Sequence, residues 1–187
     1  IPIIDADVIS RKVVEKGKRG WHRVRKAFGD EILNADHTIN RDRLGDIIFS
    51  NYEKRKLLNK CLHDLIALEI LKEILFYLVE GHAFVILDVP LLFEVKFALR
   101  FITYKIVVDC SNEQVQLSRL MSRNRQLSES DALARIHSQM ANADRLKLAD
   151  HVIDNSKDID YTRKQVARVY QVLRSSRKHY RIRIAIS

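Results

Sequence analysis

The sequence predicts an α/β fold in which helices cover a largely parallel sheet. Four short apolar runs each end in an acidic residue, and helical segments separate them; the runs are residues 1–7, 84–88, 105–109 and 151–154. Short β-branched runs without a polar break are typical of strands that are buried on both faces, as parallel strands are. Strands that alternate with helices indicate a single α/β domain over residues 1–187.

The run at residues 84–88 is the clearest strand. Gly81 precedes it and Pro90 follows it, and a proline stops further strand pairing. A buried helix could also hold residues 84–87, but the β-branched side chains and the nearby Gly and Pro favour a strand. Ligands of parallel sheets collect outside the carboxyl ends of the strands. Asp88 is therefore expected at the ligand edge.

The same logic applies to residues 1–7, which are expected to deliver Asp5 and Asp7 to that edge. The longest predicted helix is residues 52–79, where leucines recur every three or four positions along one face. Ser111 and Gln114 form a capping box that predicts a further helix start. The other predicted helices are residues 8–14, 21–31 and 40–49, a helix capped by Ser128, and residues 161–175. The basic tail, residues 176–187, has no predicted structure.

The net charge of +9 indicates anionic partners, which could be nucleic acid, phosphorylated metabolites or an acidic membrane surface, although solubility alone would also account for it. Two isolated cysteines, Cys61 and Cys110, suit a reducing compartment. No apolar run reaches 18 residues, so no transmembrane span is predicted.

Aspartates at strand ends and arginines on a helical pair suggest phosphoryl transfer. That chemistry needs a phosphate cradle, Mg²⁺, a positioned base and cations that cover the moving charge. The expected cradle is G-x-x-x-x-G-K-[ST], and it does not occur in these 187 residues.

Six motifs in order resemble those of the dephospho-CoA kinase family. They are Asp5-Ala-Asp7, Asn40-Arg41, His63, residues 87–94, the spaced residues Arg119, Arg123, Gln139 and Arg145, and residues 149–156. The resemblance covers about residues 1–175, and the wording of residues 44–49 and 120–124 is most similar to animal members. It implies a P-loop-kinase-like parallel sheet with a helical acceptor segment at residues 8–83 and a lid at residues 118–145. The family's first strand and its phosphate loop are expected to be absent from this chain.

The resemblance implies transfer of the ATP γ-phosphate, with Mg²⁺, to the ribose 3′-hydroxyl of dephospho-CoA, the last step of coenzyme A biosynthesis. Asp7 would be the base or orienter of that hydroxyl, with helix capping as the alternative. The acceptor side would comprise Asp5, Arg41, His63 and Asp88. Their alternatives are ordinary ones: a solvated helix start for Arg41, a packing role for His63, and a structural cap for Asp88.

On the ATP side the resemblance implies lid residues that close over the phosphates, namely Arg119, Arg123, Gln139 and Arg145. A charged helix face is the alternative for any one of the arginines. Asn155 and Ser156 match the loop that touches adenine in relatives.

Two departures from the family pattern stand within this chain. Asp64 follows His63 where the family has Pro, and Lys157 follows Ser156 where the family has Gly.

Because the cradle is absent, we expect this chain as given to have little or no kinase activity. The alternative function is a non-catalytic module that binds coenzyme A or a protein partner. A nucleic-acid binder rests on charge alone and is not expected. An intracellular location is expected, in the cytosol or the mitochondrion, and the oligomeric state is left open.

Overall fold

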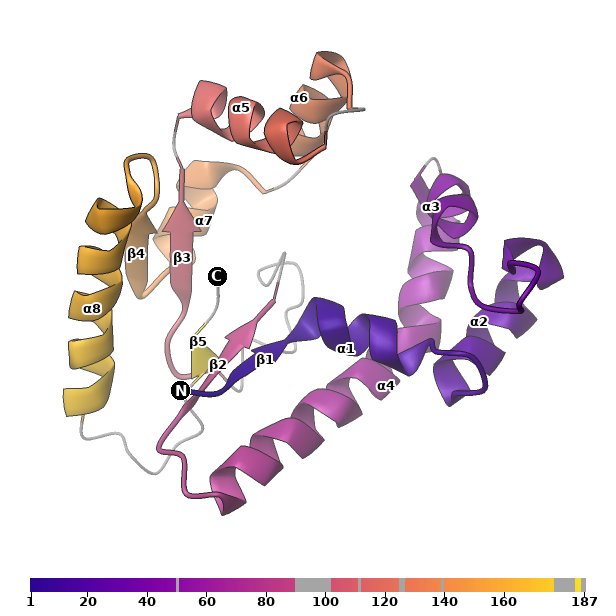
Figure 1. The fold of residues 1–187 in the computed structure, drawn as a ribbon, viewed down its shortest axis with the longest axis horizontal. Helices are drawn as coiled ribbons and strands as arrows, with labels where there is room; N and C mark the ends of the chain where they lie inside the picture. The colour runs from indigo at the N-terminus through magenta and orange to yellow at the C-terminus, as the bar shows by residue number, and fades with distance from the viewer. Residues whose placement is uncertain are drawn as a thin grey trace. The chain divides into compact units, whose positions relative to one another are not determined.

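The computed structural model describes residues 1–49, 51–89, 102–110, 112–124, 127–138, 140–176 and 184–185 (Figure 1). They form two compact units, one of residues 2–82 and one of residues 83–187 together with Ile1. The single domain with acceptor and lid segments stays a prediction.

Helices dominate the unit of residues 2–82. Its elements are β1 (Ile3–Asp5), α1 (Ala6–Val13), α2 (Arg19–Phe28), the 3₁₀ helix η1 (Asp30–Ile32), α3 (Arg41–Phe49) and α4 (Tyr52–Val79). Helix α4 contacts α1, α2 and α3. It has the predicted bounds, begins after the capping side chain of Asn51, and is followed by Gly81, whose φ of 82° suits glycine.

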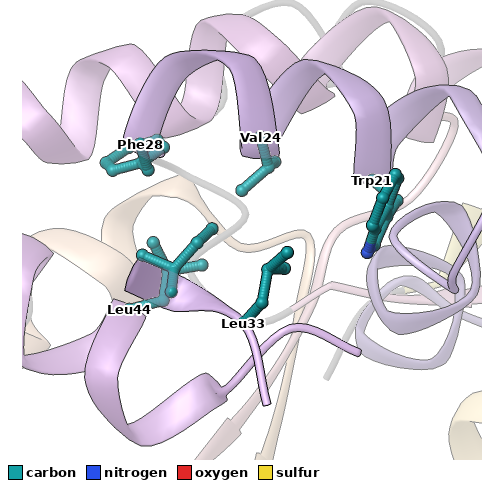
Figure 2. Close-up of a cluster of buried hydrophobic side chains, with 6 residues drawn as sticks. Trp21, Val24, Phe28, Leu33 and Leu44 are labelled. Carbon is teal, nitrogen blue, oxygen red and sulfur yellow. The ribbon is translucent and has the colours of Figure 1, made fainter. Parts of the chain in front are cut away.

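A hydrophobic cluster holds this unit together (Figure 2). Helix α2 contributes Trp21, Val24 and Phe28, whose spacing of three and four residues places them on one helix face. Leu33 and Leu44 face them from the segments that follow. All five are buried, and full burial of each large apolar side chain contributes about 1.5–3 kcal/mol. The helix predicted for residues 21–31 ends earlier, at Phe28, because Gly29 adopts a φ of 84°.

The leucine face of α4 is only partly covered. Leu58 and Leu62 pack against the cluster. Farther along the helix, leucines on the same predicted face are about half exposed: Leu68 at 46%, Leu71 at 47%, Leu75 at 48% and Leu78 at 56%. The periodicity predicted the helix, but it did not predict where that face is buried.

The unit of residues 83–187 contains the parallel strand pairs. Its elements are β2 (Val85–Asp88), β3 (Ile106–Asp109), α5 (Glu113–Arg123), α6 (Glu129–His137), α7 (Asn142–Leu148), β4 (His151–Asp154), α8 (Ile159–Ser175) and β5 (Ile184–Ala185). Strands β3 and β4 pair in parallel over four residues each, and β2 pairs in parallel with β5. Helix α8 contacts β4, and Ile106, Ile153 and Leu173 form the buried core there.

The α/β class and the parallel strands are confirmed. Helix α7 and strand β5, which lies in the basic tail, were not predicted. The predicted cap Ser111 lies outside the described residues; the side chain that caps α5 is that of Asn112, which accepts the Val115 N–H. Ser128 caps α6 as predicted. Of the motif at residues 87–94, the part from Pro90 onward also lies outside the described residues.

Among the helices that the structure describes, none is both long enough and apolar enough to cross a membrane.

Candidate active site

Two aspartates lie next to each other where strands β3 and β4 end. Asp109 and Asp154 are the last residues of these parallel strands and are register partners. Ligands of α/β sheets bind outside this edge. The segments that follow β3 and β4 contribute further side chains near these two aspartates.

The loop after β4 is held by hydrogen bonds to both strands. The Asn155 N–H donates to the Asp109 carbonyl oxygen at 2.7 Å, and the Ser156 N–H donates to Asp154 Oδ1 at 2.8 Å. The Thr162 hydroxyl donates to Asn155 Oδ1 at 3.0 Å. Hydrogen bonds from Ser156 to the Asp154 carboxylate hold the pKa of Asp154 below its ordinary value of 3.8. The predicted adenine-contacting pair, Asn155 and Ser156, therefore lies in a hydrogen-bonded loop.

Gln165 on α8 fastens the start of this loop. Its Oε1 accepts the Asp154 N–H at 3.0 Å, and its Nε2 donates to the Asp154 carbonyl oxygen at 2.8 Å. The side-chain amide thus pairs with one residue's backbone much as a neighbouring strand would. No sequence motif marked Gln165, because a lone glutamine eleven residues after a strand has no recognisable spacing.

Arg119 on α5 contacts the same loop. Its Nη1 donates to the Asn155 carbonyl oxygen at 2.6 Å, and its Nη2 lies 3.3 Å from the Lys157 carbonyl oxygen. The Arg119 side chain is half-buried, and two backbone carbonyl oxygens already accept hydrogen bonds from its guanidinium group. The structure therefore brings together Arg119 and Asn155, two residues that the sequence assigned to the ATP side.

Arg145 on α7 lies beside the buried end of β3. Its Nη2 donates to Asn142 Oδ1 at 2.7 Å and lies 3.9 Å from Asp109 Oδ1. Its buried Nε has no hydrogen-bond partner among the described residues. Asp109 is 5% exposed, and within the described part of the chain no other polar or charged residue is classed as buried. A buried carboxylate needs a nearby cation, and Arg145 supplies one.

Arg123 and Gln139 are the other residues of the predicted lid. Arg123 lies one turn after Arg119, at the end of α5, and is exposed. Gln139 lies outside the described residues. The roles of these residues in covering phosphates stay predictions.

Asp5 and Asp7 lie at the start of α1 in the unit of residues 2–82. The Asp5 carboxylate caps that helix, accepting the Asp7 N–H at 2.8 Å and the Val8 N–H at 3.0 Å. The predicted strand of residues 1–7 is therefore wrong at its end, because this cap starts the helix at Ala6. Asp7 lies in the first helical turn and is exposed.

The remaining acceptor-side predictions lie on other elements. Arg41 is the exposed first residue of α3. His63 on α4 lines a shallow hollow of about 440 Å³ with Arg23 and Lys60, and Arg23 pairs with Asp64 at 2.6 Å. Asp64, which stands where the family has Pro, thus anchors a cation beside His63. Asp88 ends β2 in the other unit and is half-buried. The meeting of these residues at one acceptor site stays a prediction.

The described residues contain no group of three or more His, Cys, Asp or Glu side chains placed to hold a metal ion. Mg²⁺ usually takes only one or two protein carboxylates and completes its shell with phosphate oxygens and water.

Comparisons with known proteins identify the family. The family profile described as dephospho-CoA kinase matches residues 1–161. A dephospho-CoA kinase domain-containing protein of Danio rerio is 46% identical over 172 residues, which are 92% of this chain and 74% of that protein. A dephospho-CoA kinase of Bacillus cereus is 43% identical over 166 residues, 89% of this chain and 82% of that protein.

Solved protein structures are also similar to this chain. A dephospho-CoA kinase from Campylobacter jejuni has a TM-score of 0.64 at 29% identity, over 92% of this chain and 85% of that chain. The protein TT1252 from Thermus thermophilus shares the fold, with a TM-score of 0.76 at 21% identity over 94% of this chain and 85% of that one. From the ordered motifs, the parallel strands and these matches, the chain belongs to the dephospho-CoA kinase family.

Proposed function

We propose that this protein works in the transfer of the γ-phosphoryl group of ATP to the ribose 3′-hydroxyl of dephospho-CoA. The observation that supports this most is the arrangement at the ends of β3 and β4. There Arg119 holds the loop of Asn155 and Ser156, and Arg145 lies beside Asp109. These two guanidinium groups lie beside Asp109 and Asp154 at the place where α/β proteins bind ligands.

On this proposal the residues divide between donor and acceptor. Asn155 and Ser156 contact adenine, while Arg119, Arg123, Gln139 and Arg145 cover the phosphates and stabilise the charge of the transition state. Asp7 orients the acceptor hydroxyl and accepts its proton. Its exposed carboxylate leaves room for a substrate. Asp5, Arg41, His63 and Asp88 surround the rest of dephospho-CoA, and Mg²⁺ neutralises charge on the ATP phosphates.

We propose further that the 187-residue chain alone transfers phosphate slowly or not at all. The sequence G-x-x-x-x-G-K-[ST] does not occur in it, and that loop supplies the backbone N–H groups and the lysine that hold the β- and γ-phosphates. With these substrates the protein would act inside the cell, in the cytosol or the mitochondrion.

Calorimetry and a phosphotransfer assay together test the proposal. We expect the chain to bind dephospho-CoA and to form little 3′-phosphorylated product with ATP and Mg²⁺. Asp7→Asn should keep most of the dephospho-CoA affinity, because the substitution changes a catalytic charge and preserves the shape of the side chain.

Three results would count against parts of the proposal. Rapid, Asp7-dependent product formation would refute the expected inactivity of the chain alone while supporting the reaction. Failure to bind either dephospho-CoA or ATP would refute the assignment of substrates to this chain. Binding of dephospho-CoA with no detectable ATP affinity would favour a coenzyme A-binding module over an enzyme.

A further inference from the structure

A second hollow lies within the unit of residues 2–82. It has a volume of about 520 Å³ and is bounded by the end of α1, the turn at Gly17, the start of α2 and the middle of α4. Sites for small molecules commonly have about 300–1,000 Å³. The hollow is formed by different side chains from the one that contains His63.

Three of the residues that line this α1–α4 hollow have large apolar side chains, and together we call them its floor. Val13 is buried, Leu65 is half-buried, and Leu68 is 46% exposed. Apolar surface that stays open to water inside a concave site favours a ligand with an apolar part.

Four other lining residues are basic, and together we call them the walls of the hollow. Lys12 on α1, Lys18 and Arg19 at the start of α2, and Lys72 on α4 line it, and Glu69 contributes the one carboxylate among its lining residues. Two of the lysines also have acidic partners outside the lining. Lys18 lies 2.5 Å from Glu15, and Lys12 lies 4.0 Å from Glu73.

One of these cations contacts Glu69 directly. Lys72 Nζ donates to Glu69 Oε1 at 2.6 Å. That hydrogen bond is the main reason that the pKa of Glu69 is below its ordinary value of 4.5, and the charges of Lys72, Lys12 and Lys18 lower it further. Lys72 therefore stabilises the Glu69 carboxylate directly, and the charges of Lys12 and Lys18, on other elements, also favour its ionised form.

We propose that the α1–α4 hollow binds an amphipathic anion, a molecule with a phosphate or carboxylate group on a single alkyl or acyl chain. The anionic group takes the place that Glu69 occupies among the cations, and the chain covers Leu65 and Leu68. Lys12 lies five residues along α1 from Asp7, roughly 7–8 Å along the helix axis. The proposal concerns a separate site and does not depend on the kinase function.

The first test compares three probes on the full 187-residue chain by calorimetry. Decyl phosphate, below its critical micelle concentration, should bind at least about tenfold more tightly than inorganic phosphate or the neutral detergent decyl maltoside. Only decyl phosphate can contact both the basic and the apolar residues of the hollow. Equal binding of inorganic phosphate would overturn the amphipathic character, and equal binding of decyl maltoside would overturn the anionic one.

Substitutions in the hollow provide a sharper test. Glu69→Gln should tighten decyl phosphate binding about fivefold, because it removes the competing carboxylate, and Lys72→Gln should weaken it by a similar factor. Leu68→Asn should also weaken decyl phosphate binding, because it removes apolar surface that the alkyl chain would cover. The matched controls on α4, outside the hollow, are Glu53→Gln, Lys56→Gln and Leu78→Asn, all at exposed positions.

A uniform effect would overturn the proposal: if Glu53→Gln tightened binding as much as Glu69→Gln, net charge would explain the result. Displacement of decyl phosphate by coenzyme A in direct competition would also overturn it, because the hollow would then belong to the acceptor site. Circular dichroism and the melting temperature of each variant show that folding is retained.

Discussion

The Arg119 guanidinium on α5 donates a 2.6 Å hydrogen bond to the backbone carbonyl of Asn155, 36 residues further along the chain. The contact links the helix that begins the predicted lid to the loop predicted to touch adenine. Hydrogen bonds with a charged donor are stronger than neutral ones. Among the side chains of α5, we therefore expect that of Arg119 to contribute most to the position of the loop.

Replacing Arg119 by Ala should loosen the loop after β4. The free energy of unfolding should fall by about 1–2 kcal/mol, since a partly exposed charge-assisted hydrogen bond is lost. Amide hydrogen exchange at Ser156 and Lys157 should speed up. Urea denaturation and exchange measured by mass spectrometry check both effects.

Arg123→Ala is the matched control, because Arg123 is exposed one turn later on the same helix. It should leave stability and exchange in the loop unchanged. Arg119→Lys should restore only part of the stability, since one ammonium group lacks the fork that reaches two carbonyls. Equal exchange in the Arg119→Ala and Arg123→Ala proteins would contradict the anchoring role.

Gln165→Ala should destabilise the protein by about 1–2 kcal/mol, because the Asp154 N–H and carbonyl both lose their partner in a half-buried place. Gln165→Glu should also destabilise it, since a carboxylate accepts the N–H but repels the carbonyl oxygen. Thermal denaturation measures the loss. Gln171→Ala, at an exposed position on the same helix, should have no effect, and a loss there as large as at Gln165 would rule out a specific clamp.

The Asp154 carboxylate should make part of the stability sensitive to acid. Its pKa in the folded protein is below the ordinary value of 3.8, so the stabilisation is complete above that value and is lost as the pH falls through the folded-state pKa. In Asp154→Asn this component disappears, because the side chain no longer titrates. Unfolding free energies at pH 5 and at pH 3 should therefore differ less in Asp154→Asn than in the wild-type chain, and an unchanged difference would contradict the assignment.

Asp5 offers a way to separate a cap from a ligand-binding charge. Asp5→Ala should cost about 0.5–2 kcal/mol of stability through loss of the α1 cap, whereas Asp5→Asn should cost little, because asparagine caps as well as aspartate. Urea denaturation tests the cap. If Asp5→Asn keeps stability but weakens dephospho-CoA binding in calorimetry, the carboxylate also serves the acceptor. Destabilisation by Asp5→Asn as large as by Asp5→Ala would contradict a pure capping role in the fold.

Local patterns predicted most of the elements correctly, for reasons that lie within short stretches of chain. The 3.6-residue period and the capping side chain of Asn51 define α4, and the run from His151 to Asp154 is β4 with its predicted bounds. Errors arose where two local signals compete. The first strand was predicted to continue to Asp7, but the Asp5 carboxylate caps α1, so the helix begins at the next residue, Ala6.

The amino-acid sequence by itself determined the α/β class, the ends of the long helix and the ordered motifs that identify the family, because each depends on residues close together in the chain. Only the tertiary structure decided that Arg119 meets Asn155, that Gln165 holds Asp154, and that Asp109 is buried beside Arg145. Those contacts join residues that are 36, 11 and 36 positions apart. No local period or spacing encodes them, since they form only when β3 and β4 pair and the helices pack beside them.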